Sequence, residues 1–404
     1  MLKTKIKAFT LEQICFGMLL LYIAIGYFAN DVILPTVINS VVLFLFLGIA
    51  AITIISKKGI KLPPILIWGG ICLFGAFVAM LYSPTISVFS GTYYKLIVNF
   101  ILVFILSQLD WNKKRLDYVF SVFTSSGALL IILLSLTGNL EDESGRLGEK
   151  LTGNANILAI MLMMSAIYGF WLIVSSSKVW LKIVFILCEL TIYFGMFLSG
   201  GRKYVVVPII FLLIIWISKT DKKGKRHALK YSLITLLLFG SLFYVVMKVP
   251  MFYETIGYRF EGFFSIFDDS YDIDGSTDVR IKMIKGALCE WINNPIFGHG
   301  FDSFKYFNRD YLTGYFYYSH NNFVELLYNQ GIVGFAIYYS MYVYLVVKNS
   351  FNNRSSLHRG FVFGAIIALL IFDFFEVTYS ISPVQFFLFF SITLLNQNII
   401  NDNN

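Results

Sequence analysis

One segment of the chain places a histidine and two amides directly before a long hydrophobic stretch. Ser319, His320, Asn321 and Asn322 open this segment, and the stretch from Asn322 to Val347 is predominantly apolar and long enough to cross a bilayer. An imidazole can accept a proton near neutral pH, whereas amides form hydrogen bonds without exchanging protons. Polar residues at the edge of a membrane span commonly mark function, so we expect the chemistry of this protein to lie here.

The composition of the 404 residues is that of a membrane protein. Hydrophobic residues make up 57% of the chain and charged residues only 14%, which a water-soluble domain of this length does not tolerate. We predict an all-α polytopic integral membrane protein with about twelve transmembrane helices. The apolar runs cover residues 9–29, 32–55, 62–82, 93–109, 117–137, 155–174, 179–198, 203–218, 229–248, 322–347, 359–377 and 383–400.

The basic residues are distributed unevenly among the loops. Alternate connections carry well over half of the 32 Lys and Arg residues, and the remaining connections are short and poor in basic residues, apart from one long loop over residues 249–319. Because Lys and Arg in short loops stay in the cytoplasm, we predict that both termini are cytoplasmic. The long loop, Arg202 and His320 then face outward, where a basic residue such as Arg202 opposes the charge bias and calls for a function.

The predicted organisation is one membrane domain over residues 1–404. It divides into nine transmembrane helices, one long external loop and three further helices, at residues 1–248, 249–319 and 320–404. Within the loop, the spacing of apolar residues from Asp278 to Asn293 predicts an amphipathic helix at the membrane face. Aromatic residues from Tyr306 to Tyr318 are interpreted as membrane-interface anchors, with stacking against sugar rings as the alternative.

We expect no cofactor, no metal and no nucleic-acid partner. The net charge of +8 is explained by cytoplasmic anchors beside anionic lipid, and phosphate-loop, dinucleotide-binding and HExxH motifs are absent. The acidic run from Asp268 to Asp274 does not fit a calcium loop, because Ser270 and Ile281 stand where carboxylates are needed. We interpret that run as a solvated turn, and Asp31 as a loop carboxylate rather than a base.

Four stretches of the chain, in order, carry a recognisable combination of motifs. They are TGNAN at Thr152–Asn156, SGGR at Ser199–Arg202, the block Arg280–Phe304 that contains NPIFGHG, and His320-Asn321 followed after nine residues by Gly331–Gly334. Together they resemble the GNxN, SGSR, R...W...NPIxGxGxxxF and HNx9GxxG motifs of the membrane-embedded O-antigen and capsule polymerases, a family that includes the O-antigen ligases. Gly201 departs from the second Ser of SGSR. The resemblance covers roughly residues 150 to 350 and none of the first five spans.

The resemblance implies a multi-span transferase of lipid-linked sugars, similar in architecture to the GT-C class. Its members transfer glycan from polyprenyl diphosphate at the outer face of the cytoplasmic (inner) membrane, without nucleotide or metal. The implied partners are an undecaprenyl-diphosphate-linked oligosaccharide and membrane lipid, together with a chain-length regulator and a flippase of the same pathway.

Such a transfer needs a base near the attacking hydroxyl and cations on the departing diphosphate. The roles implied by the resemblance are general base for His320, diphosphate binding for Arg202, Arg280 and Arg259, and substrate positioning for Asn154, Asn156 and Asn321. Simpler alternatives are a helix cap for His320, contact with helix ends for the three asparagines, contact with lipid phosphate for Arg202 and an ordinary surface charge for Arg259. Gly331 and Gly334 are expected to permit close helix packing.

The sequence leaves the acceptor open. We favour a polymerase, which adds the growing glycan to the next lipid-linked repeat unit. The alternative within the family is a ligase, which hands the finished glycan to a lipid A core or another anchor. A second alternative, from another functional class, is a flippase of the same lipid-linked units.

Overall fold

A computed structural model describes residues 10–30, 32–57, 59–84, 91–140, 146–152, 154–218, 225–264, 275–351 and 356–396. Asp31, interpreted above as a loop carboxylate, and the run Asp268–Asp274, interpreted as a solvated turn, lie outside these residues. Helices make up most of the described chain, and its β pairing is limited to one isolated bridge between Ala29 and Leu34.

Each predicted apolar run corresponds to a helix. Polar residues are few in these runs, and Pro208 is an interior proline of α9 (Arg202–Ser218) that the helix accommodates. Within the described ranges, ten helices are long and apolar enough to cross a membrane. The two predicted spans outside this set, α9 and α17 (Ser382–Asn396), have 17 and 15 residues. The prediction of an all-α polytopic membrane protein is confirmed.

The helices group into two compact units, and α4 (Gly91–Gln108) and α8 (Val179–Ser199) each run from one unit into the other. The first unit spans residues 1–62 and 104–192, and the second spans residues 63–103 and 193–404. Besides part of α4 and α8, the first unit holds α1 (Leu11–Phe28), α2 (Thr36–Ser56), α5 (Lys113–Leu136), α6 (Glu149–Thr152) and α7 (Ala155–Ser175).

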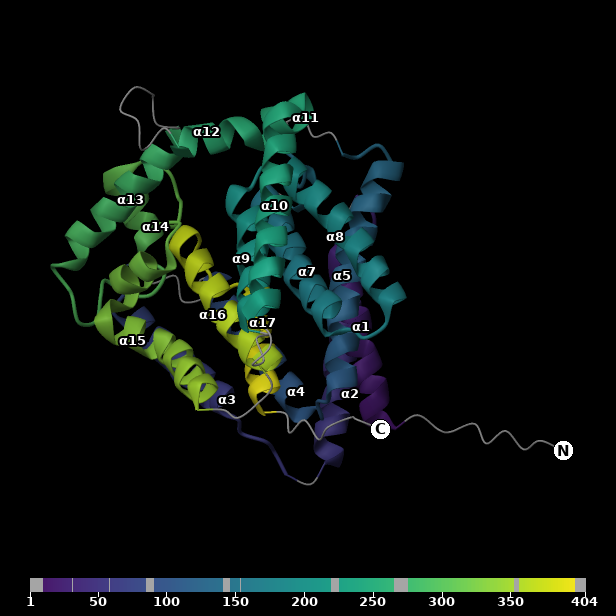
Figure 1. The fold of residues 1–404 in the computed structure, drawn as a ribbon. Helices are drawn as coiled ribbons and strands as arrows, with labels where there is room; N and C mark the ends of the chain where they lie inside the picture. Colours follow the sequence, from purple (N-terminus) through teal and green to yellow (C-terminus); the bar gives the residue numbers. More distant parts are fainter. Residues whose placement is uncertain are drawn as a thin grey trace. The chain divides into compact units, whose positions relative to one another are not determined.

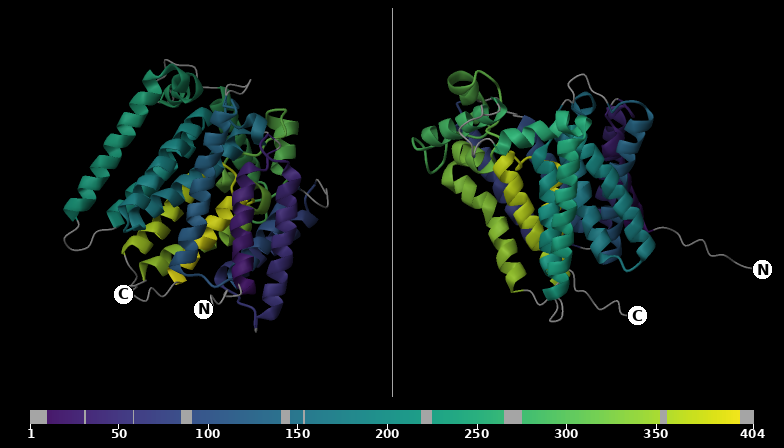
Figure 2. Two further views of the ribbon diagram at one scale, coloured as in Figure 1. Left: turned by 90° about the vertical axis from the view of Figure 1, so that its right-hand side faces the viewer. Right: turned by 45° about the horizontal axis from the view of Figure 1, so that its top comes forward.

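In the first unit, α1 packs beside α2, and α5 packs beside both α7 and α1 (Figures 1 and 2). Gly127 on α5 allows this close approach, because a Cβ built there would lie 2.5 Å from Oγ of Ser165 on α7. The same hydroxyl forms a hydrogen bond of 2.7 Å with the Tyr27 hydroxyl on α1. Small residues and buried hydroxyls therefore join the three helices, as is common between helices in membranes.

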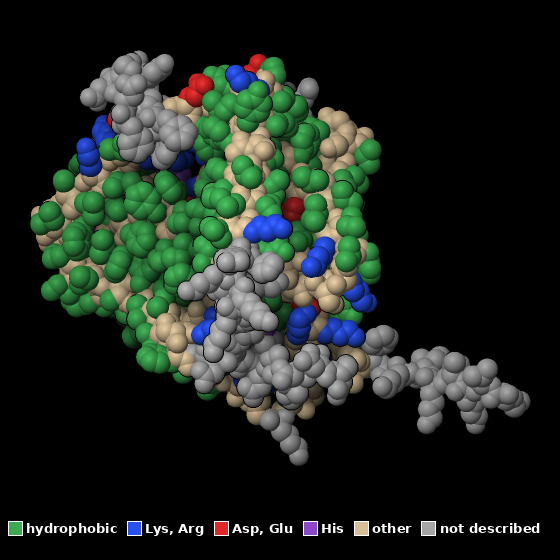
Figure 3. All heavy atoms as spheres, in the orientation of Figure 1, with side chains coloured by type: hydrophobic (Ala, Val, Ile, Leu, Met, Phe, Trp, Pro, Cys, Tyr) green, Lys and Arg blue, Asp and Glu red, His purple; other side chains and the backbone are tan. Residues whose placement is uncertain are grey.

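The second unit contains the long segment predicted as an external loop, and that segment is largely helical. Besides α3 (Pro64–Leu81) and most of α4, it holds α9, α10 (Lys225–Lys248), α11 (Pro250–Phe252), η1 (Tyr253–Gly257), α12 (Tyr258–Phe264), α13 (Gly275–Trp291), α14 (Phe304–Phe307), η3 (Asn308–Leu312), α15 (Asn322–Ser350), α16 (Ser356–Phe375) and α17. Here α16 packs against α9, α15 and α17, and α15 packs against α3 and α13 (Figure 1). Hydrophobic side chains gather over the faces of α10 and α15 that Figure 3 shows, as expected of surfaces that contact lipid.

The predicted amphipathic helix is α13, which begins and ends close to the expected residues. Its apolar face is covered by protein: Met283 and Ala287 are buried in a cluster with Phe304, Val324 and Tyr328. The helix that carries Arg280 is therefore fixed to α14 and to the first turns of α15 by its apolar residues.

A kink in α15 explains the glycine at position 331. Gly331 adopts φ 64° and ψ −167°, a conformation essentially limited to glycine, and a Cβ there would lie 2.2 Å from the Ile296 carbonyl oxygen. The interrupted helix bonds to the loop before α14 through Ile332 N–H to Pro295 O (2.9 Å) and Val333 N–H to Ile296 O (3.2 Å). Gly331 thus admits a loop backbone rather than the neighbouring helix that the sequence analysis expected.

Candidate active site around His320

The N-terminus of α15 is tied to the C-terminus of α16 by amide side chains. Asn321 caps α15: its Oδ1 accepts a hydrogen bond of 3.0 Å from Val324 N–H, and its Nδ2 donates one of 3.1 Å to Phe374 O. Asn322, fully buried, accepts a hydrogen bond of 2.9 Å from Thr378 N–H. Both donor and acceptor of the Asn321 amide are used by the protein, so this residue orients helix ends.

His320 precedes this cap in an unusual backbone conformation. Its φ is 55°, and only one other non-glycine residue in the described part of the chain, Asp302, has a positive φ. Such a conformation costs about 1–2 kcal/mol for a residue with a Cβ, so the surrounding contacts must hold it. The side chain of His320 is 25% exposed, which leaves the imidazole accessible to a ligand.

The imidazole faces a carboxylate that lies outside the four sequence motifs. Nδ1 of His320 lies 3.5 Å from Oε1 of Glu376, directly after α16. The other oxygen, Oε2, forms an ion pair of 2.6 Å with Nζ of Lys203 and accepts a hydrogen bond of 3.3 Å from the hydroxyl of Tyr204. Lys203 also donates to Phe375 O at 2.7 Å. Glu376 therefore faces the Nδ1 side of His320, so Nε2 is the nitrogen left to face a substrate.

Charged neighbours keep Glu376 ionised. Burial by itself would raise the pKa of this carboxyl, but the attraction of Lys203 and the interaction with His320 outweigh burial and hold its pKa well below its usual range. A carboxylate that stays charged can stabilise an imidazolium when His320 takes up a proton.

Two of the three candidate arginines belong to the same neighbourhood. Arg202 begins α9 next to Lys203, and its guanidinium donates to the backbone carbonyl oxygen of Arg259. Arg259 lies on α12, half-buried, with Nε donating to the hydroxyl of Tyr258 at 2.9 Å. Arg202, Arg259 and His320 are thus connected through contacts within the second unit.

The remaining candidates differ in their surroundings. Arg280 is half-buried on α13 and forms no hydrogen bond or ion pair with the part of the chain that the structure describes. Asn154 and Asn156 belong to the first unit: Asn154 caps α7, and Oδ1 of Asn156 accepts a hydrogen bond of 3.3 Å from Arg146. The structure therefore brings together His320, Asn321, Arg202, Arg259 and Lys203 and adds Glu376, whereas Arg280 has no hydrogen-bond or ion-pair partner among the described residues.

A signal for Glu376 was present in the sequence. It is the acidic residue that ends the span before the last one, and under the predicted topology this places it on the same side as His320. An isolated carboxylate at a helix end has no motif of its own, so only the contact with His320 gives it a role.

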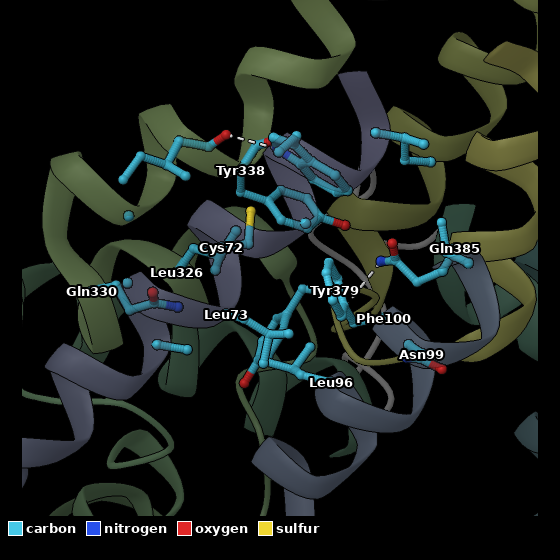
Figure 4. A pocket seen from close by; sticks show the side chains of 18 residues that line it. Cys72, Leu73, Leu96, Asn99, Phe100, Leu326, Gln330, Tyr338, Tyr379 and Gln385 are labelled. Atoms are coloured by element: carbon cyan, nitrogen blue, oxygen red, sulfur yellow. Dashed lines mark hydrogen bonds between the residues drawn. The ribbon is translucent and has the colours of Figure 1, made fainter. Parts of the chain in front are cut away.

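A separate cavity of about 60 Å³ lies in the second unit, lined by residues of α3, α4 and α15 (Figure 4). Its lining is mainly apolar, and its polar side chains, such as Asn99, Gln330 and Gln385, are uncharged. Figure 4 shows Gln385 directed at Tyr379, whose carbonyl oxygen accepts its hydrogen bond at 3.1 Å. None of the candidate site residues lines this cavity, so it is distinct from the site around His320.

Comparison with known proteins gives one result for this region. Residues 187–339 match the family model described as O-Antigen ligase. The match includes Arg202, Arg259, Arg280, His320 and Gly331, and it ends before Glu376. No curated protein matches the chain.

Proposed function

We propose that this membrane protein, whose residues 187–339 match the O-Antigen ligase family model, polymerises the repeat units of a surface polysaccharide. The growing glycan is transferred from undecaprenyl diphosphate to a hydroxyl of the next lipid-linked repeat unit. In this proposal the reaction takes place at the outer face of the cytoplasmic membrane and needs no metal.

The observation that carries the proposal is the Lys203–Glu376–His320 arrangement. The carboxylate is fixed by the 2.6 Å ion pair and lies 3.5 Å from Nδ1 of His320, and the imidazole is partly exposed. A carboxylate that faces Nδ1 of a histidine can orient the imidazole and stabilise its protonated form, which supports general base catalysis by Nε2. Contacts of this kind are commonly long without substrate and shorten when it binds.

The chemical step follows from these groups. The acceptor hydroxyl oxygen forms a bond to the anomeric carbon of the donor sugar, and its proton passes to Nε2 of His320. The bond between that carbon and the diphosphate oxygen breaks, and the electron pair leaves with the diphosphate. Glu376 stabilises the imidazolium, and the proton returns to solvent once the product leaves.

Arginines offset the charge that develops on the leaving group. Arg280, which has no protein partner in the described chain, and Arg202, at the start of α9, present planar guanidinium groups that bind two phosphate oxygens at once. Arg259 is the third cation of this set. Their charge favours cleavage because the negative charge on diphosphate is larger in the transition state than in the bound donor.

We favour the polymerase, and the ligase is the second candidate, because the family model that matches this chain is described by that activity. A deletion strain distinguishes the two when its lipid-linked and anchored glycans are separated on gels. Anchored glycan reduced from a ladder to single repeat units supports the polymerase. Long chains that accumulate on the lipid carrier support the ligase, and repeat units trapped on the cytoplasmic side would overturn both assignments in favour of a flippase.

A further inference from the structure

A buried carboxylate lies directly behind the turn that carries His320. Glu325, in the first turn of α15, is fully buried, and both of its oxygens accept hydrogen bonds. Oε2 accepts from the backbone N–H of Ser319 at 2.9 Å, and Oε1 accepts from Nδ2 of Asn329 at 3.0 Å. Because Ser319 immediately precedes His320, Glu325 fixes the backbone from which the candidate base projects.

Asn329 extends these contacts to a second turn. Its Oδ1 accepts hydrogen bonds from the backbone N–H groups of Ser303 at 3.1 Å and Phe304 at 3.0 Å. Phe304 belongs to the apolar cluster that holds α13, the helix with Arg280. One hydrogen-bonded pair therefore links the His320 turn to the support of a candidate diphosphate-binding arginine.

The backbone conformations on both sides of the pair support a functional role. The described chain has two non-glycine residues with positive φ, Asp302 at 60° and His320 at 55°. Each is the direct neighbour of a residue that this pair binds through its backbone N–H, Ser303 and Ser319 respectively. Strained conformations persist only where the surroundings determine them, and they concentrate at functional sites.

We propose that Glu325 and Asn329 are positioning residues, which hold the imidazole of His320 in its reactive orientation and at a set distance from the helix of Arg280. The proposal rests on the proposed function, because it assumes that His320 is the base. A purely structural pair would stabilise α15 without affecting the imidazole.

The donor and acceptor pattern allows a swap of the two groups. In Glu325→Gln the new amide nitrogen faces Nδ2 of Asn329, so two donors oppose each other. In Asn329→Asp two carboxylates oppose each other. The double variant restores every bond: the amide oxygen at 325 accepts from Ser319, its nitrogen donates to the carboxylate at 329, and that carboxylate still accepts from Ser303 and Phe304.

Two readouts on the purified full-length protein test the proposal. The first is the rate at which diethyl pyrocarbonate modifies His320, followed by mass spectrometry of its peptide, and the second is the turnover number for glycan transfer. We expect each single variant to lose about tenfold or more in turnover, since a buried group is left unsatisfied. Modification of His320 should accelerate by about threefold or more, because the turn opens locally. The double variant should recover both.

Asn349→Asp is the matched control, because Asn349 is a buried amide at the other end of α15 that donates to Arg359 O at 3.0 Å. It should leave the modification rate at His320 unchanged. Single variants that lose thermal stability but keep the wild-type modification rate would overturn the proposal. A double variant with turnover and modification rate as altered as those of the single variants would also overturn the proposal. If the single variants fail to accumulate, the double variant alone is compared with the wild type, and the same result overturns the proposal. If the swap restores the modification rate but wild-type protein transfers no glycan, positioning stands and the proposed function fails.

Discussion

Glu376→Gln separates the two tasks that the structure gives to one carboxylate. Oε2 neutralises Lys203 at 2.6 Å, and Oε1 lies 3.5 Å from Nδ1 of His320. The side chains of Lys203 and Glu376 are only 12% and 16% exposed, so an unpaired lysine should lower the free energy of unfolding by about 3 kcal/mol. A positioned base contributes about 10² to 10⁴ in rate, and losing its fixed carboxylate should lower turnover about 100-fold.

A second variant distinguishes the loss of stability from the loss of activity. Lys203→Met combined with Glu376→Gln removes both charges, so the double variant should regain most of the lost stability. Turnover should stay low, because His320 still lacks its carboxylate. The assay is transfer from a synthetic polyprenyl-diphosphate oligosaccharide in proteoliposomes, with unfolding followed by intrinsic fluorescence. Wild-type turnover in the stable double variant would refute the orienting role of Glu376.

Three further outcomes are expected. Gly331→Ala should destabilise the protein by about 3 kcal/mol or more, because the backbone conformation of residue 331 is limited to glycine and the added Cβ would clash with the backbone of Ile296. An unchanged thermal midpoint would contradict the close contact between α15 and the loop before α14. Arg280→Lys and Arg202→Lys should each lower transfer by about tenfold or more at wild-type abundance, because an ammonium cannot bind two oxygens in a plane; full activity in surface-glycan gels would argue against diphosphate binding. The pKa of Glu376 is depressed below its ordinary value of 4.5, so its ion pair stabilises the fold fully above that pH and less as pH falls through the lower folded-state pKa. The difference in unfolding free energy between wild type and Glu376→Gln should therefore stay constant down to about pH 5.5 and shrink only below about pH 4.5; a difference that shrinks between neutral pH and pH 5.5 would exclude a depressed pKa.

The sequence predicts those features that depend on local composition. Apolar runs become helices because a chain in a bilayer must satisfy its backbone polar groups internally, and each run of the list above has its helix. The position of His320 and Asn321 at the start of α15 also follows from the polar residues that precede the span.

Features that depend on contacts between distant segments could not be predicted. Glu376 acquires its role only when the end of α16 packs against the start of α15, and no local pattern encodes that contact. Likewise, the sequence predicts that Gly331 packs against a helix, because a small residue is needed whether a neighbouring helix or a loop backbone approaches closely. For Asn321 the sequence allows either substrate positioning or contact with helix ends, and the bonds to Val324 and Phe374 are of the second kind.

The most direct test of the central claim is the transfer activity of His320→Ala in purified, folded protein. Asn321 and Glu325 hold α15 without the imidazole, so the variant should keep the thermal stability of the wild type to within about 1 kcal/mol. Its turnover should fall by about 10² to 10⁴, with donor binding retained. A His320→Ala protein that extends glycan at the wild-type rate would contradict the assignment of His320 as the base.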